Sequence, residues 1–244
     1  MTVAPPRPAD VSSTDHGARV AAMFGRIAWR YDLMNTLMTG GLDERWRQLA
    51  VRAARPPRNG RALDVGTGTG KLALALARAM PNGRVVGVDL AEPMLRWARP
   101  ISGPAPATGT VSLALADAQS LPFADDSFDC ATTAFVIRNV ADVGAAFREL
   151  RRVVRPGGRI VCLELTHPSP ALWGALFGLY FGKVVPVIGR LVTGDDGAYS
   201  YLPESVAAFL RPDGLANAMA AAGLRSVRWR RLGLGTVTLH VGTV

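Results

Sequence analysis

The segment from Ala62 to Leu72 constrains this chain most, because an apolar run leads into a glycine-rich turn and then into a helical pattern. The turn contains Gly66, Gly68 and Gly70 with threonines between them. Glycines lack a Cβ atom, so the chain can bend sharply and a ligand can lie against backbone N–H groups near a helix N-terminus. The segment therefore predicts a nucleotide-like ligand at the end of a first strand.

The spacing of the glycines narrows the class of ligand. A Walker phosphate loop has a glycine five residues before its Gly-Lys pair and a Ser or Thr after the lysine, but Val65 and Leu72 stand at those positions. The dinucleotide fingerprint has a third glycine, or a close substitute, where this chain has Lys71. The spacing excludes an ATPase or GTPase and weakens the case for an NAD site.

A second predicted strand, from Val85 to Val88, leads directly into Asp89, 19 residues after Gly70. A carboxylate at that place can accept hydrogen bonds from both hydroxyls of a ribose. Together, the turn and Asp89 resemble the S-adenosylmethionine site of class I methyltransferases. Two other interpretations stay open: an ordinary tight turn for the glycines, and a plain helix N-cap for Asp89.

Strand and helix patterns alternate along the rest of the chain, which is typical of a parallel sheet. We expect an α/β fold of the Rossmann-like class I methyltransferase type, with a seven-stranded, mostly parallel sheet and helices on both faces. The expected strands are 61–65, 84–88, 110–116, 128–135, 159–165, 225–231 and 235–241, and the expected helices include 91–98, 141–153 and 212–222.

The predicted domain organisation is one methyltransferase domain, 19–244, after a disordered tail, 1–18. The domain begins with cap helices (19–55) and carries a helical lid insert (168–205). Residues 171–192 of that insert are strongly apolar, but Lys183, Pro186 and Arg190 argue against a membrane span. We expect the insert to cover a hydrophobic substrate and to touch a bilayer surface, and the alternative is that it completes the core.

Charge and composition limit the partners. The net charge is +9, and all but two of the 28 basic residues are arginines, spread along the chain rather than clustered with aromatic residues. This distribution argues against nucleic acid and is compatible with an anionic membrane surface. Cys130 and Cys162 lie in apolar runs and indicate a reduced, cytoplasmic setting. The three histidines show no metal-ligand spacing, so no metal is expected.

Further motifs carry a family resemblance. They are Phe24–Asn35 followed by Trp46-Arg47, Asp117-Ala118 before Leu121-Pro122-Phe123, Phe135–Val140, Pro156-Gly157-Gly158-Arg159 and Ala198–Ser205. With the glycine turn, they resemble the ubiquinone and menaquinone biosynthesis C-methyltransferase family over nearly the whole chain from Phe24. The resemblance implies methyl transfer from S-adenosyl-L-methionine to a ring carbon of a reduced isoprenoid quinone precursor such as demethylmenaquinol.

The resemblance also implies site residues. The cofactor residues are Asp64, Gly66, Thr67, Gly68, Thr69, Gly70, Asp89, Leu90, Met94, Asp117, Ala118 and Ala134. The catalytic residues are Arg138, Asn139 and Tyr31. The substrate-binding residues are Tyr31, Asn35, Val136, Tyr199 and Tyr201. We expect Arg138 to stabilise a developing phenolate and, with Asn139, to hold a water through which the proton leaves; the alternative is an ion pair plus a helix cap.

Three positions depart from the family pattern. Lys71 stands where an acidic residue is common, Val136 where glycine is usual, and His167 in a stretch that often holds lysine. A branched Val136 beside the transferred methyl narrows the acceptor pocket, so another small aromatic or lipid-like acceptor stays open. A noncatalytic lipid- or partner-binding module is the second alternative. Peripheral membrane contact and a homodimer are further expectations.

Overall fold

The computed structural model describes residues 8–101, 109–166 and 196–244, whose strands form one seven-stranded sheet in the order β3-β2-β1-β4-β5-β7-β6. The strands are β1 (Arg61–Val65), β2 (Arg84–Asp89), β3 (Thr110–Leu115), β4 (Phe128–Ala134), β5 (Val154–Leu165), β6 (Arg225–Leu232) and β7 (Val237–Thr243). The α-helices are α1 (Pro8–Thr39), α2 (Leu42–Ala54), α3 (Lys71–Ala79), α4 (Glu92–Ala98), α5 (Val143–Val153), α8 (Asp196–Ala208) and α9 (Pro212–Ala221). The 3₁₀ turns are η1 (Arg99–Ile101), η2 (Ile137–Asn139) and η4 (Gly233–Gly235).

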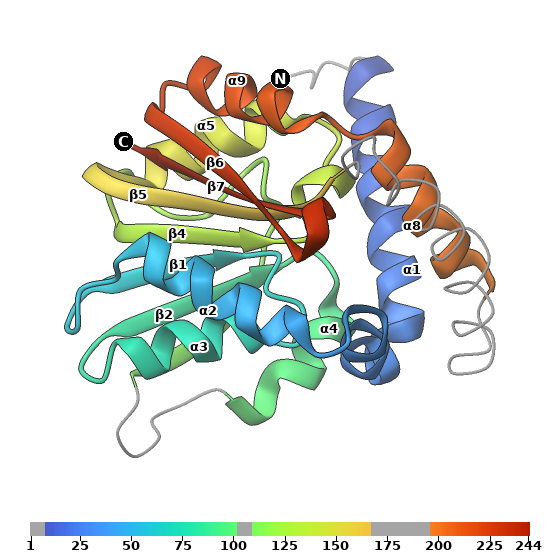
Figure 1. Cartoon of the computed structure of the whole chain (residues 1–244), viewed down its shortest axis with the longest axis horizontal. Coiled ribbons are helices and arrows are strands. Elements are labelled where there is room, and N and C mark those ends of the chain that lie inside the picture. The colour runs from blue at the N-terminus through green and yellow to red at the C-terminus, as the bar shows by residue number, and fades with distance from the viewer. Residues whose placement is uncertain (1–7, 102–108, 167–195) are drawn as a thin grey trace, which may run out of the picture.

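The sheet is mostly parallel, as the sequence predicts. Strands β1 to β5 pair in parallel, whereas β7 is antiparallel to both β5 and β6. Two hydrophobic clusters cover its faces. One contains buried residues of α2 and α3, and the other contains buried residues of α5 and α9. Figure 1 shows these helices on opposite sides of the strands, and the predicted fold class is confirmed.

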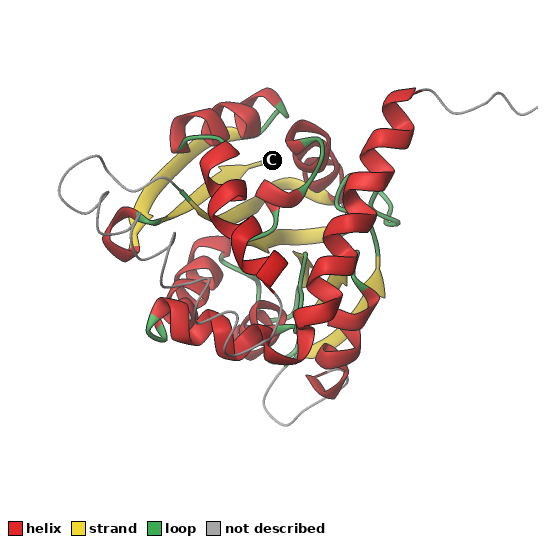
Figure 2. Ribbon diagram, turned by 90° about the vertical axis from the view of Figure 1, so that its right-hand side faces the viewer, coloured by secondary structure: helices red, strands yellow, loops and turns green. Residues whose placement is uncertain are grey.

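The N-terminal helix corrects one expectation. Helix α1 begins at Pro8, so residues 8–18 are helical rather than part of a disordered tail, and residues 1–7 lie outside the described part. The helix contacts α2, α4 and α8. Seen from the α1 side, it stands in front of the sheet together with the other helices of that end (Figure 2). Tertiary packing of this kind contributes most of the stability of helices in proteins.

Other boundaries differ by a few residues. Strand β5 begins at Val154 rather than Arg159, because Val154 already pairs with Phe128, ahead of a register shift that leaves the extra residues in β5. Helix α5 begins at Val143, where the Asp142 side chain accepts a hydrogen bond from Ala145 N at 2.9 Å. Of the expected lid insert, 168–195 lies outside the described residues and 196–205 is helical in α8. None of the helices in the described ranges combines the length and apolarity that a bilayer crossing needs.

The sheet order places a cleft at one edge. Strand β1 lies between β2 and β4, so the chain leaves the carboxyl ends of β1 and β4 toward opposite halves of the sheet. Open α/β sheets bind their ligands at such a switch point. The glycine turn follows β1 directly, and α1 and α8 stand beside this end of the strands (Figure 1).

The three glycines of the turn all have positive φ, at 67° for Gly66, 57° for Gly68 and 83° for Gly70. A Cβ at Gly66 would overlap the side chain of Val136, and one at Gly70 would overlap Ile101. A Cβ at Gly68 would meet nothing within 4 Å. Gly66 and Gly70 are therefore required for packing as well as for conformation, whereas Gly68 faces open space.

Replacing Gly66 with Ala tests this packing, with Gly157→Ala as the matched control. Gly157 has φ of 81° and open space around its Cα, so the control carries only left-handed strain, about 1 kcal/mol. Gly66→Ala adds the overlap with Val136. It should lower the free energy of unfolding, measured by urea titration, by a further ~1–3 kcal/mol. Val136→Gly in the Gly66→Ala background should recover the added part. Equal losses for the two single variants would contradict the overlap.

Candidate active site

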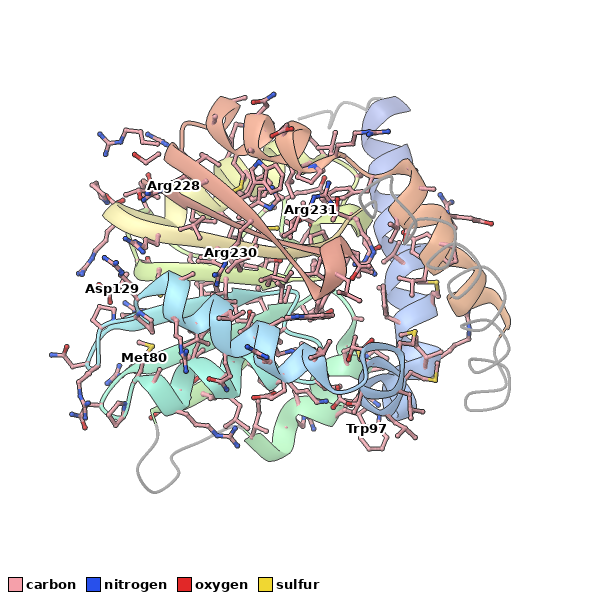
Figure 3. All side chains as sticks on the ribbon, viewed as in Figure 1. Met80, Trp97, Asp129, Arg228, Arg230 and Arg231 are labelled. Atoms are coloured by element: carbon pink, nitrogen blue, oxygen red, sulfur yellow. The ribbon has the colours of Figure 1, made fainter. Side chains whose placement is uncertain are left out.

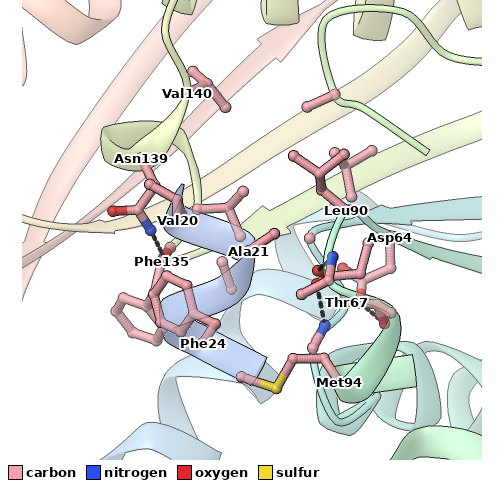
Figure 4. Close-up of a pocket in the computed structure, with 18 of the residues that line it drawn as sticks. Val20, Ala21, Phe24, Asp64, Thr67, Leu90, Met94, Phe135, Asn139 and Val140 are labelled. Atoms are coloured by element: carbon pink, nitrogen blue, oxygen red, sulfur yellow. Dashed lines mark hydrogen bonds between the residues drawn. The ribbon is translucent and has the colours of Figure 1, made fainter. Parts of the chain in front are cut away.

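A cleft of about 1030 Å³, counted out to its open mouth, lies at the carboxyl ends of β1 to β4. Figure 4 looks into it, with Val20, Ala21 and Phe24 of α1 on one side and Asp64 and Thr67 on the other. One wall is thus apolar and helical, and the opposite wall is made of strand ends and loops.

Asp89 holds the glycine turn from the end of β2. Its Oδ2 accepts a hydrogen bond from Gly68 N at 2.8 Å, and its Oδ1 accepts one from Ala91 N at 2.8 Å. Burial raises the pKa of this carboxyl, while the backbone N–H groups of Ala91, Gly68 and Leu90 oppose the rise. Ala91, not Asp89, is the N-cap of α4. Each carboxylate oxygen keeps a lone pair, so Asp89 can still accept from the hydroxyls of a ribose.

Asp64 supports the turn from beneath. It is only 1% exposed, and its two oxygens accept hydrogen bonds from Thr67 Oγ1 and Thr132 Oγ1, both at 2.8 Å. Burial raises the pKa of Asp64 to about 6, although both hydroxyls and Arg47 oppose the rise. Asp64 lines the floor of the cleft and holds the loop that carries Gly66 to Gly68.

Helix α1 is tied to the far end of the turn. The Thr69 hydroxyl donates to Asp32 Oδ1 at 2.8 Å, and Lys71 Nζ lies 3.5 Å from the same oxygen. The lysine that departs from the family pattern therefore has an acidic partner on α1. The next helix, α3, has Gly70 as N-cap and no side-chain cap. Its first N–H groups can bind an anionic group of a ligand, such as an amino-acid carboxylate.

The loop after β3 forms another part of the wall. Asp117 Oδ1 accepts a hydrogen bond from Gln119 N at 2.9 Å, which shapes the loop around Ala118. Leu90 and Met94 line the same cleft. A carboxylate beside small apolar surfaces suits the exocyclic amine and flat ring of adenine.

The loop after β4 carries the predicted catalytic pair. Asn139 lines the cleft, and its Oδ1 accepts a hydrogen bond from the Tyr201 hydroxyl of α8 at 3.2 Å. Arg138 is not among the described cleft-lining residues. Its Nη1 lies 2.9 Å from Glu164 Oε1 in a buried ion pair. The ion pair of the alternative interpretation is therefore present, whereas α5 is capped by Asp142 rather than by Asn139.

The structure brings most of the predicted site residues together. Those that line the cleft are Asp64, Gly66, Thr67, Gly68, Thr69, Asp89, Leu90, Met94, Asp117, Ala118, Ala134, Val136 and Asn139. Gly70, Asn35, Arg138 and Tyr201 are not among the described lining residues. The side chains of Tyr31 and Tyr199, and all of His167, lie outside what the structure describes. The roles of individual residues stay predictions.

Sequence reasoning missed part of the wall. Gly17, Val20 and Ala21 of α1 line the cleft together with Phe24. Their spacing of three, four and seven residues marks one helical face, a signal that was present in the sequence. Gln119, Phe135 and Arg47 also line the cleft and carried no such signal. Within the described ranges, no three His, Cys, Asp or Glu side chains form a group that could hold a metal ion.

Comparison with known proteins assigns the family. A model of the ubiE/COQ5 methyltransferase family matches residues 12–244. The chain belongs to this family. It is therefore an S-adenosylmethionine-dependent methyltransferase, and the predicted enzyme is confirmed over a noncatalytic module.

Several methyltransferases are similar to this chain over nearly their full length. A demethylmenaquinone methyltransferase of Roseiflexus castenholzii is 46% identical, with 91% of this chain and 92% of the relative covered. One of Thermus thermophilus is 48% identical over 90% of this chain and 99% of the relative. A ubiquinone/menaquinone biosynthesis C-methyltransferase UbiE of Geobacter sulfurreducens is 41% identical over 94% of this chain and 90% of the relative.

Solved structures agree on the fold. An S-adenosylmethionine-dependent methyltransferase of Thermotoga maritima superimposes with a TM-score of 0.63 and 22% identity, covering 91% of this chain and 98% of that one. The [4+2]-cyclase SpnF superimposes with a TM-score of 0.66 and 17% identity, covering 93% and 96%. At these identities, the likeness shows the shared fold alone.

The cleft of this family member fits its cofactor. Open space above Gly68 allows close approach of a ligand to the backbone, and the half-buried Asp89 carboxylate lies beside it. Asp64, Asp89 and Asp117 line the cleft together with Arg47 and Lys71, so the lining carries side chains of both signs. Such a lining suits a ligand that carries sulfonium and ammonium groups together with a carboxylate.

The raised pKa of Asp64 predicts that the free energy of unfolding depends on pH. The Asp64 carboxyl binds its proton more tightly in the folded state than in the unfolded chain. Protonation therefore stabilises the fold at low pH, and this contribution is lost as the pH rises through about 6. At about 1.4 kcal/mol per pH unit, the difference from 3.8 corresponds to about 3 kcal/mol at most. Urea unfolding at pH 4 and pH 7 should show the wild type losing stability relative to Asp64→Asn. A difference that stays constant or grows would contradict this.

Asp89→Asn should weaken cofactor binding. The substitution removes a charged acceptor, worth about 1.5–3 kcal/mol per hydrogen bond, and places an amide N–H against a backbone N–H. We expect the dissociation constant of S-adenosylmethionine, measured by calorimetry, to rise about 10- to 150-fold. Asp126→Asn is the control, because Asp126 is exposed at φ 54°, which asparagine tolerates. Equal affinity of Asp89→Asn and the control would rule out the ribose role.

Proposed function

We propose that this chain transfers the methyl group of S-adenosylmethionine to a ring carbon of a reduced isoprenoid quinone precursor, with demethylmenaquinol as the acceptor. The observation that carries this proposal is the relation, at 46% and 48% identity over nine tenths of the chain, to enzymes named demethylmenaquinone methyltransferase. Because another relative is named for ubiquinone as well as menaquinone, the ubiquinone precursor is the second candidate acceptor.

The reaction sets two tasks for the protein. S-adenosylmethionine supplies an electrophilic methyl group on a positively charged sulfonium. A hydroquinone ring carbon becomes a better nucleophile when the neighbouring hydroxyl loses its proton. The chain must therefore hold the ring in line with the methyl group and must assist the departure of that proton.

The apolar wall meets the first task. Val20, Ala21 and Phe24 of α1 face the cleft opposite the glycine turn, and Val136 lines it from the loop after β4. These side chains cannot form hydrogen bonds with the ring or with water. They favour a flat, apolar acceptor and exclude solvent from the reacting centre.

Asn139 and Tyr201 are the groups we assign to the second task. The Tyr201 hydroxyl donates to Asn139 Oδ1, and Asn139 reaches the cleft from the β4 loop. Burial and the negative charge of Glu164 raise the pKa of Tyr201, while the positive charge of Arg138 opposes the rise. We assign to the Arg138 guanidinium the electrostatic stabilisation of the phenolate from behind the cleft wall, and to Asn139 the water that carries the proton away.

Further acceptor contacts come from α1 and α8, which touch one another. Asn35 of α1 has a buried Nδ2 without a hydrogen-bond partner in the described part of the chain. A quinol oxygen or an ordered water would satisfy it. Tyr31 on α1 and Tyr199 on α8 complete the proposed acceptor site.

Val136 supports a second candidate function. It lines the cleft and packs so closely on Gly66 that no Cβ fits there, and so it fills space beside the glycine turn. A smaller aromatic or lipid-like acceptor would tolerate this narrowing. The cofactor contacts are common to both functions, so only the acceptor distinguishes them.

We also propose a cytoplasmic enzyme that meets its acceptor at a membrane surface. The net charge of +9 favours anionic lipid headgroups. Leu33 and Leu37 lie one turn apart on α1 with 52% and 48% of their surfaces exposed. Exposed leucines on α1, the helix that also lines the cleft, suit a shallow bilayer contact. The alternative use of the same leucines is a homodimer.

The test is methyl transfer by the purified full-length chain with labelled S-adenosylmethionine and reduced acceptors. Demethylmenaquinol, the ubiquinone precursor quinol and a panel of simple phenols are supplied in neutral and in anionic vesicles. We expect labelled product from demethylmenaquinol above all, with the methyl located on the ring carbon by mass spectrometry, and faster turnover in anionic vesicles. Preferred labelling of a phenol would overturn the acceptor. Equal rates in both vesicles would overturn the membrane contact.

A further inference from the structure

Glu164 of β5 is a fully buried carboxylate next to the loop that carries the predicted catalytic pair. Its exposed fraction is 0%, and it accepts hydrogen bonds from three donors. They are Arg138 Nη1 at 2.9 Å, Arg138 N at 3.3 Å and Leu165 N at 2.8 Å. Two of the three belong to η2, so Glu164 fixes this turn to the neighbouring strand through both its backbone and its side chain.

The turn that Glu164 holds has an unusual conformation. Phe135 has a φ of 63°, a left-handed value that a bulky residue adopts only when its surroundings require it. Its carbonyl accepts Arg138 Nη1 at 2.6 Å and Asn139 Nδ2 at 3.5 Å. Arg138 therefore links Glu164 to the Phe135 carbonyl, and the same carbonyl orients the Asn139 amide.

The direction of that amide decides what the cleft presents. With Nδ2 turned toward Phe135, Asn139 leaves Oδ1 to accept from the Tyr201 hydroxyl at 3.2 Å. A continuous set of contacts thus runs from Glu164 through Arg138 and Asn139 to Tyr201. Asn139 is the member of this set that lines the cleft.

We propose that Glu164 is a positioning residue for the methyl transfer: it holds Arg138 so that Asn139 and Tyr201 meet the acceptor hydroxyl in the right orientation. This inference rests on the proposed function. Glu164 lies behind the cleft wall and acts through Arg138 rather than on the substrate. The side-chain exposures of 4% for Arg138 and 0% for Glu164 leave no room for solvent to replace either partner.

The chain offers a matched control in Asp129 of β4. Its carboxylate also accepts a backbone N–H, Arg61 N at 2.6 Å, and pairs with a guanidinium, that of Arg155. It also links neighbouring strands of the same sheet. Arg61 begins β1, so Asp129 lies at the opposite end of the strands from the glycine turn, as its label in Figure 3 shows.

The experiment compares Glu164→Gln with Asp129→Asn in the full chain. Glutamine keeps the shape but loses the charge and turns an amide N–H toward a donor. We expect kcat with demethylmenaquinol to fall about 10- to 100-fold in Glu164→Gln, with the dissociation constant of S-adenosylmethionine within twofold of wild type. Asp129→Asn should keep kcat within about twofold. Equal losses of kcat in the two variants, or a loss confined to cofactor affinity, would overturn the positioning role.

A double variant separates positioning from stability. Glu164→Gln with Arg138→Met removes both charges together, so no unpaired charge is left buried. We expect its urea midpoint to recover toward wild type while kcat stays low, because the Phe135 carbonyl and Asn139 have lost their donor and support. Recovery of kcat along with the midpoint would show that the pair is merely structural. If the wild type is active and Glu164→Gln is equally active, the positioning role alone is overturned. If the wild type methylates no quinol, the proposed function is overturned as well.

Discussion

The glycine turn depends on two carboxylates, the buried Asp64 and the half-buried Asp89, that hold it from different strands. Asp64 accepts from Thr67, and Asp89 accepts from Gly68, so the backbone between them cannot relax into another turn. Burial raises the pKa of both groups, which means that the folded state bears an electrostatic cost at neutral pH. This strained but rigid arrangement keeps open the space above Gly68 that a ligand needs.

The same construction recurs along the edge of the sheet. Asp89 at the end of β2 holds the loop after β1, and Glu164 near the end of β5 holds the loop after β4. These two loops of the cleft are therefore each held by a carboxylate from a neighbouring strand. Strands are the rigid part of the fold, so the ligand-facing loops inherit their positions from the sheet.

Local sequence signals predicted the sheet, the glycine turn and the carboxylate at position 89 because each depends on residues close in the chain. The contacts behind Arg138 could not be predicted in this way. Glu164 lies 26 residues away, and Tyr201 lies 62 residues from Asn139. The ion pair of Arg138 was therefore only an alternative, and Glu164 had no predicted role. The start of α1 was also missed, and this helix packs against α4 and α8, which are distant in the chain.

Two departures from the family pattern show how the cleft accommodates change. Lys71 introduces a positive charge beside the glycine turn, and Asp32 of α1 lies 3.5 Å from it, so the charge ties the helix to the turn. Val136 adds a branched side chain, and the absence of a Cβ at Gly66 leaves the space that it fills. The hydrogen bonds that Asp89 accepts from Gly68 and Ala91 involve neither side chain. Under the proposed function, Lys71 and Val136 therefore change the α1 wall and the β4 loop, and so the choice of acceptor, while the residues assigned to the cofactor stay the same.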